Sequence, residues 1–169
     1  GIYGYGFGEL LISGCTITGN TCQYDGEGGG AGIRGYLGDT TIIDCTISDN
    51  TAASVGGGIM TSSTTTISGC RISDNTGGFG GGLYSVSTHL ITISSTVVCG
   101  NTSGQIYFDD WIDGGDNCVQ DSCEDCIIIR NVPDDYPTIQ GAIDASLDGD
   151  VIDIAPGTYN EHSLNPAGK

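Results

Sequence analysis

The eight cysteines of this 169-residue chain are the side chains whose type and spacing most clearly suggest metal binding or disulfide formation. The spacing of Cys123 and Cys126 matches half of a zinc site, but the sequence has no second such pair and no paired histidines. Disulfides that staple this segment in an oxidising compartment are therefore the favoured interpretation. The candidate disulfide residues are Cys22, Cys99, Cys118, Cys123 and Cys126.

Three other cysteines, Cys15, Cys45 and Cys70, recur at equivalent places in a repeat. On neighbouring strands their Cα atoms would lie about 4.8 Å apart, which is within disulfide range. Parallel side chains in register rarely reach the dihedral angle of a disulfide without strain. We therefore favour a buried column of free thiols that act as small apolar side chains.

An acidic loop between residues 109 and 117 has the atoms that calcium prefers. Calcium binds six to eight oxygens from carboxylates and carbonyls, often on a glycine-containing loop. Asp109, Asp113 and Asp116 are the candidate ligands. The loop lacks the spacing of an EF-hand, so the alternative is an acidic turn without metal. Calcium is the one cofactor that the sequence suggests.

Aromatic and cationic residues follow the glycine clusters of the repeat and could form an exposed surface that binds sugar or another protein. The candidates for this surface are Tyr3, Arg34, Tyr36 and Tyr84. A lyase of this kind would pair a basic residue with acidic calcium ligands, and neither Arg34 nor Arg71 has such a group on its own coil. No carboxylate pair suited to glycoside hydrolysis stands out. We name no catalytic residue, and an enzyme is the less favoured interpretation.

The charge balance excludes two classes of partner. The chain has 21 acidic and 4 basic residues, giving a net charge of −17. Nucleic-acid binding requires a cationic surface, so we expect no nucleic-acid partner. Anionic lipid surfaces are disfavoured for the same reason. No run of 18 apolar residues is present, so no membrane insertion is expected.

These candidate residues sit on a repeat of about 25 residues. Asn20, Asn50, Asn75 and Asn101 each precede a threonine and are spaced 30, 25 and 26 residues apart. An aliphatic residue lies three positions before each asparagine, and an isoleucine lies eight positions before. A glycine cluster ending in glycine plus an aliphatic residue opens each repeat. This period fits one coil of a solenoid with three short strands and three bends.

One such coil cannot bury its own apolar face, so the coils must stack. Stacking predicts an all-β, right-handed parallel β-helix with columns of inward isoleucines. Asparagine tolerates left-handed backbone and hydrogen-bonds neighbouring main chain, so the four asparagines should form a ladder at a bend. The two predicted columns are Ile12, Ile42, Ile67 and Ile93, and Ile17, Ile47, Ile72 and Val98.

Two segments of this repeat resemble a known family. Gly56-Gly57-Gly58-Ile59 and Ile72-Ser73-Asp74-Asn75 resemble the GGA(I/L/V) and FxxN repeats of polymorphic membrane proteins, which are bacterial surface β-helices. Isoleucine or valine replaces the family's phenylalanine, and glycine usually replaces its alanine. The resemblance covers residues 1–104 and implies a location outside the cell or on a bacterial surface. It predicts the fold better than any activity.

The repeat of about 25 residues is not seen after Asn101. Residues 105–126 are rich in aspartate and cysteine and are expected to close the solenoid. Residues 127–169 contain Pro137-Thr138-Ile139-Gln140, a short amphipathic helix and an alternating strand at Val151. This stretch resembles the N-terminal capping region of pectate-lyase-like β-helices. A starting cap at this position predicts first strands of a following or stacked β-helix.

The sequence therefore favours a structural or adhesive β-helix module of an extracellular protein, possessing no identified catalytic site. The order of its parts predicts partners at its ends, namely copies of itself or adjacent β-helix units that could build a filament or tandem array. Polysaccharide is the other partner considered. The alternative function is a piece of a carbohydrate-active β-helix enzyme, a polysaccharide lyase or hydrolase.

Overall fold

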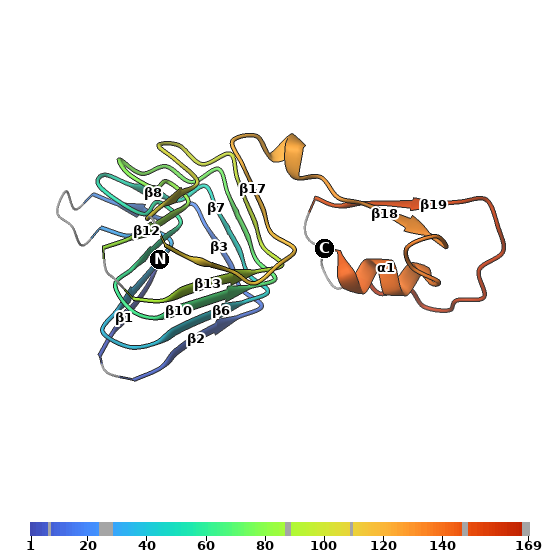
Figure 1. Cartoon of the computed structure of the whole chain (residues 1–169), viewed down its shortest axis with the longest axis horizontal. Coiled ribbons are helices and arrows are strands. Elements are labelled where there is room, and N and C mark those ends of the chain that lie inside the picture. Colours follow the sequence, from blue (N-terminus) through green and yellow to red (C-terminus); the bar gives the residue numbers. More distant parts are fainter. Residues whose placement is uncertain (7, 24–28, 87–88, 109, 147–148, 167–169) are drawn as a thin grey trace. The chain divides into compact units, whose positions relative to one another are not determined.

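A computed structural model describes residues 1–6, 8–23, 29–86, 89–108, 110–146 and 149–166. The chain forms two compact units, Gly1–Cys126 and Ile127–Lys169, and each is described by itself (Figure 1). In the first unit, three parallel sheets wind around one apolar core, each receiving one strand per coil. The unit is a parallel β-helix, as the repeat predicts, and it has five coils.

The first sheet has the strand order β1-β5-β9-β12-β15. Ile2, Ile33, Ile59, Leu83 and Ile106 are register partners that point into the coils. The next residue of each strand points outward, so this sheet carries the predicted aromatic positions. Its strands are β1 (Ile2–Tyr5), β5 (Ile33–Tyr36), β9 (Ile59–Thr61), β12 (Leu83–Ser85) and β15 (Ile106–Tyr107).

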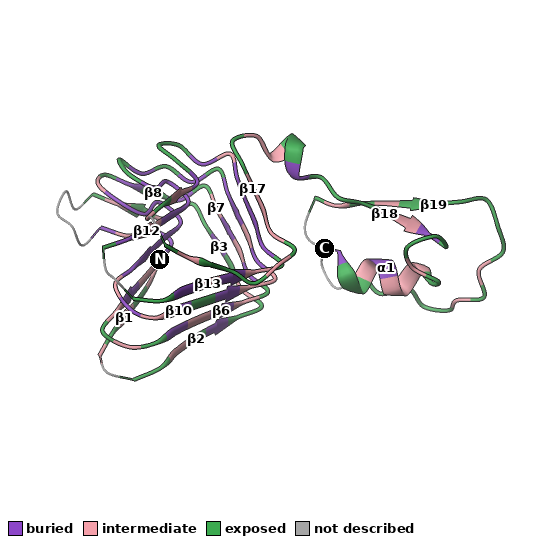
Figure 2. Ribbon diagram, in the orientation of Figure 1, coloured by how far each residue is buried: buried purple, intermediate pink, exposed green. Residues whose placement is uncertain are grey.

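The second sheet has the order β16-β13-β10-β6-β2, and its register stacks the predicted column from Ile12 to Ile93. All four isoleucines of this column are buried, which confirms the prediction (Figure 2). Its strands are β2 (Leu10–Ser13), β6 (Thr40–Ile43), β10 (Thr65–Ser68), β13 (Ile91–Ser94) and β16 (Ile112–Asp113).

The third sheet has the order β17-β14-β11-β7-β3 and stacks Ile17, Ile47, Ile72 and Val98, all buried. This second column is therefore also confirmed. A two-stranded sheet of β4 (Thr21–Cys22) and β8 (Thr51–Ala52) flanks it. The strands of the third sheet are β3 (Thr16–Thr18), β7 (Thr46–Ser48), β11 (Arg71–Ser73), β14 (Val97–Cys99) and β17 (Cys118–Gln120).

The bends show where left-handed backbone is used. The residue before each ladder asparagine has a positive φ, and the asparagine itself does not. Glycine and aspartate adopt this conformation at little cost, which explains their place in the repeat. The sequence analysis had instead expected left-handed backbone at the asparagines themselves. These bend residues are Gly19 (66°), Asp49 (55°), Asp74 (57°) and Gly100 (65°).

Residues 105–126 differ from the expected closing segment, because most of them add a fifth coil. β15, β16 and β17 extend all three sheets in register. This coil is shorter than the others and has no ladder asparagine, so its repeat is not visible in the sequence. The 3-10 helix η1 (Cys123–Cys126) follows β17.

The second unit contains the predicted short helix and strand. β18 (Ile129–Val132) pairs in parallel with β19 (Val151–Ile154), and α1 (Ile139–Ala145) lies between them in the chain. Thr138 caps α1 by accepting a hydrogen bond from the Gly141 amide. Among the described residues of the chain, no helix is long and apolar enough to cross a membrane.

Candidate ligand-binding surface

The four predicted asparagines form a continuous ladder. The Nδ2 of each asparagine donates to the Oδ1 of the next, at 2.9 Å from Asn20, 2.9 Å from Asn50 and 3.0 Å from Asn75. The backbone N–H of each also donates to that same Oδ1, at 2.9–3.0 Å. Asn50 and Asn75 are completely buried. The ladder thus satisfies polar groups at the bend inside the core.

Gln105 ends the ladder in place of a fifth asparagine. Its Oε1 accepts from the Nδ2 of Asn101 at 2.8 Å and from the Asn101 amide at 3.2 Å. Its Nε2 donates to the Asn101 carbonyl at 3.1 Å. Sequence reasoning missed Gln105 because it follows Asn101 by four residues, whereas the ladder spacing is about 25. Its role required knowing that the chain folds back at Ser103 and Gly104, both of positive φ.

Four of the five disulfide candidates are paired in the structure. Cys99 joins Cys123, and Cys118 joins Cys126, so two bridges hold η1 against the last coils. Cys22, the fifth candidate, is a free and half-buried thiol. It lies on β4, where its register partner is Ala52 rather than another cysteine.

The predicted cysteine column consists of free thiols, as the sequence analysis favoured over disulfides; its members are Cys15, Cys45 and Cys70. Cys45 and Cys70 are buried, and each thiol donates to a carbonyl two residues earlier at 3.2 Å. Burial raises the pKa of the Cys70 thiol to about 12 and also raises the pKa of Cys45. Both thiols therefore remain protonated and poorly nucleophilic.

The proposed calcium ligands are arranged around a turn. The Oδ1 of Asp113 accepts from the Gly115 amide at 2.9 Å and from the Nδ2 of Asn117 at 2.7 Å. Asp116 has a positive φ of 57°. Asp109 lies outside the described residues. Within the described part of the chain no cluster of three metal-binding side chains occurs, so calcium binding stays a prediction.

The first sheet brings together three of the four surface candidates. The guanidinium carbon of Arg34 lies 4.9 Å from the ring centre of Tyr3 and 5.6 Å from that of Tyr36. Tyr5, which the sequence reading did not select, stacks on Tyr36 with ring centres 5.4 Å apart and planes within 6°. Tyr3 and Tyr5 are 58% and 69% exposed. We call Tyr3, Tyr5, Arg34 and Tyr36 the first aromatic group.

Tyr84, the fourth candidate, belongs to a separate cluster on the same sheet. It stacks on Tyr107 with ring centres 5.6 Å apart and planes within 15°. Phe79 packs against Tyr107 at 5.4 Å, and both rings are at least half exposed. We call Phe79, Tyr84 and Tyr107 the second aromatic group. Tyr5 could have been found from strand alternation after Tyr3, whereas Tyr107 lies on the unrecognised fifth coil.

Met60 separates the two groups. It is the register partner of both Arg34 and Tyr84, so it occupies the outward row between them. It is nevertheless 1% exposed. The backbones of Gly30 and Gly56 approach its Cβ so closely that an added Cβ at either glycine would lie 2.8 Å away. The outward row is thus interrupted at the middle coil.

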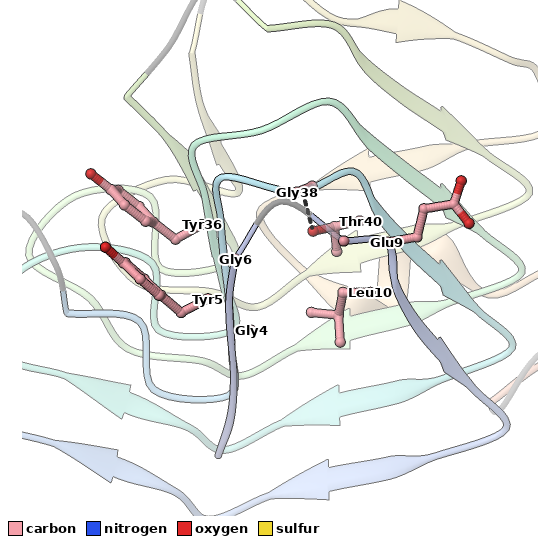
Figure 3. A pocket seen from close by; sticks show the side chains of 9 residues that line it. Gly4, Tyr5, Gly6, Glu9, Leu10, Tyr36, Gly38 and Thr40 are labelled. Atoms are coloured by element: carbon pink, nitrogen blue, oxygen red, sulfur yellow. Dashed lines mark hydrogen bonds between the residues drawn. The ribbon is translucent and has the colours of Figure 1, made fainter.

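A hollow of about 180 Å³ lies beside the first group, at the bend between the first and second sheets. Figure 3 shows the parallel rings of Tyr5 and Tyr36 on one side and Glu9 on the other, with Leu10 and Thr40 between them. Gly4, Gly6, Gly8 and Gly38 also line the hollow. The backbone is therefore accessible beside two stacked aromatic rings.

Comparison with known proteins supports the fold assignment. The family described as "Right handed beta helix region" matches residues 1–144, and the chain belongs to this family. The β-helix is accordingly right-handed. Neither the curated proteins nor the solved structures contain a significant match to the chain. The narrower resemblance to polymorphic membrane proteins stays a prediction.

Proposed function

We propose that this chain is an extracellular adhesive module that binds polysaccharide through the outward face of its first sheet. The observation that carries the proposal is the set of stacked and exposed rings in the two aromatic groups. Monomeric proteins seldom leave several large rings exposed side by side without a partner. Tyrosine rings offer a flat apolar face with a polar edge, which suits the C–H faces and hydroxyls of sugars.

Two further features support this proposal, the first for an extracellular setting and the second for binding. The two disulfides form and persist in oxidising compartments and are rare in reducing ones. The stacked coils present a rigid surface, because the core columns and the asparagine ladder run through neighbouring coils. A rigid scaffold lowers the entropic cost of ordering the binding side chains. End-to-end association of copies remains a separate prediction, which light scattering at increasing concentration tests.

Affinity electrophoresis in gels that contain neutral plant, fungal or bacterial polysaccharides tests the proposal. The wild-type chain should be retarded by at least one polysaccharide, and Tyr36→Ala should lose most of that retardation. Leu11→Ala is the matched control, since Leu11 is 66% exposed on the second sheet. Equal retardation of all three proteins, or none by any polysaccharide, contradicts the proposal. Release of new reducing ends would instead support the carbohydrate-active alternative.

A further inference from the structure

The free thiols of Cys15, Cys45 and Cys70 form a regular column at the bend between the second and third sheets. In each of these three coils the cysteine follows a strand of the second sheet and directly precedes a strand of the third. The residues that follow the cysteines are register partners on β3, β7 and β11. Each Sγ lies 3.2 Å from the carbonyl oxygen two residues earlier in its own coil. The three sulfurs therefore repeat at the strand spacing of about 4.8 Å.

The column belongs to a second hydrogen-bonded ladder, which continues beyond the cysteines. The Cys15 amide donates to the Sγ of Cys45 at 3.4 Å. Further along, the Cys70 amide donates to the Oγ1 of Thr96 at 3.2 Å, and the Thr96 amide donates to the Oδ1 of Asn117 at 3.0 Å. The Thr96 hydroxyl donates to the carbonyl two residues earlier at 2.8 Å, as each thiol does. A hydroxyl thus replaces a thiol within the same ladder.

From this geometry we propose that the sulfurs of Cys15 and Cys45 bind one soft, two-coordinate cation, Cu(I), between the first two coils. A bond between a thiolate and a metal ion is about 2.3 Å long in zinc sites, so two collinear bonds span about 4.6 Å. This span is close to the spacing of the sulfurs. Thiolates select soft ions such as Cu(I) over calcium or magnesium. The proposal is independent of polysaccharide binding by the first sheet.

The shape of the column excludes metal ions that need more protein ligands. Sulfurs at three successive levels of the stack do not converge on one point. In the part of the chain that the structure describes, no three metal-binding side chains surround a common point. Zinc requires three or four protein ligands, and calcium requires six to eight oxygens. A cation that is satisfied by two sulfurs is the class that fits this arrangement.

Access and proton release favour the Cys15–Cys45 pair over the Cys45–Cys70 pair. Cys15 is half-buried, whereas Cys70 is completely buried and its pKa is raised to about 12. Burial also raises the pKa of Cys45, so its proton leaves only when the cation replaces it. The Cys15 amide stabilises the resulting Cys45 thiolate by donating to its sulfur. Two thiols and one Cu(I) thus give one bis-thiolate complex and two protons released to solvent, without electron transfer.

Anaerobic competition between the whole chain and the chelator bicinchoninate for Cu(I) tests the proposal, without reductants that would open the two disulfides. We expect one tightly held Cu(I) per chain, and X-ray absorption should show two sulfur neighbours. Cys15→Ser and Cys45→Ser should each weaken binding by about 100-fold or more, whereas Cys22→Ser and Cys70→Ser should bind as wild type. Because two protons leave, the affinity should rise about 100-fold per pH unit near neutral pH.

Serine keeps a hydroxyl in the ladder, as Thr96 does, so the variants should fold, and circular dichroism melting checks this. Loss of binding in Cys22→Ser or Cys70→Ser, with binding kept in Cys15→Ser, would overturn the proposal. So would Zn(II) binding as tight as that of Cu(I), or no Cu(I) held against the chelator. A disulfide between Cys15 and Cys45 in the purified protein, detected by mass spectrometry, would also overturn it. The X-ray absorption of the wild-type complex does not depend on the stability of any variant.

Discussion

Replacing Asn75 by alanine should be among the most damaging single changes to the first unit. Asn75 is completely buried, and its side chain makes four hydrogen bonds. Its Oδ1 accepts from the amide and the Nδ2 of Asn50, and its Nδ2 donates to the Ile47 carbonyl and to the Oδ1 of Asn101, all at 2.9–3.0 Å. In Asn75→Ala, the Asn50 side chain would keep its hydrogen bond to the Ile17 carbonyl. The backbone N–H of Asn50 would lose its acceptor, the Oδ1 of Asn75.

The size of the effect follows from these bonds. An unsatisfied buried polar group costs about 1–3 kcal/mol, so we expect Asn75→Ala to lower the free energy of unfolding by about 3 kcal/mol. For a chain of this size the melting temperature should fall by about 6–12 °C. Asn20→Ala should cost less, because Asn20 is half-buried and lies at the end of the ladder. Urea denaturation followed by circular dichroism measures both. A midpoint for Asn75→Ala equal to that of Thr66→Ala, an exposed control, would refute the reasoning.

Three other predictions concern the cysteines and the acidic loop. The double variant Cys99→Ser/Cys123→Ser should lose about 3 kcal/mol of stability in chemical denaturation, because this bridge closes a loop with a sequence separation of 24. Burial raises the pKa of the Cys70 thiol from its ordinary value of 9.0 to about 12, so as the pH rises this thiol ionises in the unfolded chain before it ionises in the folded one. The free energy of unfolding should therefore decline between these two pH values. Cys70→Ala should remove this part of the decline in a pH–stability curve. If Asp113 and its neighbours bind calcium, a chelator should lower the melting temperature and excess calcium should restore it, whereas an unchanged curve favours the metal-free turn.

The core of the first unit could be predicted because its signal is local and repeated. The isoleucines at fixed distances before Asn50 and Asn75 reveal both the two-residue alternation of a strand and the coil length. The ladder was predictable for the same reason. The bend residues Asp49 and Asp74 were less evident, because aspartate in a bend has several ordinary roles. Their positive φ becomes clear only when the backbone is known.

The candidate surface was only partly predictable. Tyr3, Arg34 and Tyr84 share a place after the glycine clusters, so their common row could be deduced from alignment of the repeats. The division of this row into two aromatic groups could not be deduced from the repeats, because it depends on the packing of Gly30 and Gly56 over Met60. Such packing joins residues on different coils and leaves no local pattern. Tyr107 was missed because its coil is shorter and lacks the repeated asparagine.

The most direct test of polysaccharide binding by the first sheet is an NMR titration that follows the tyrosine ring resonances. A neutral oligosaccharide of five or six residues should shift the ring resonances of at least one aromatic group on this sheet, whose tyrosines are Tyr3, Tyr5, Tyr36, Tyr84 and Tyr107. Tyr136 and Tyr159, in the second unit, should not move. Shifts at Tyr136 or Tyr159 alone, or no shifts for any oligosaccharide, would contradict a glycan-binding face on this β-helix.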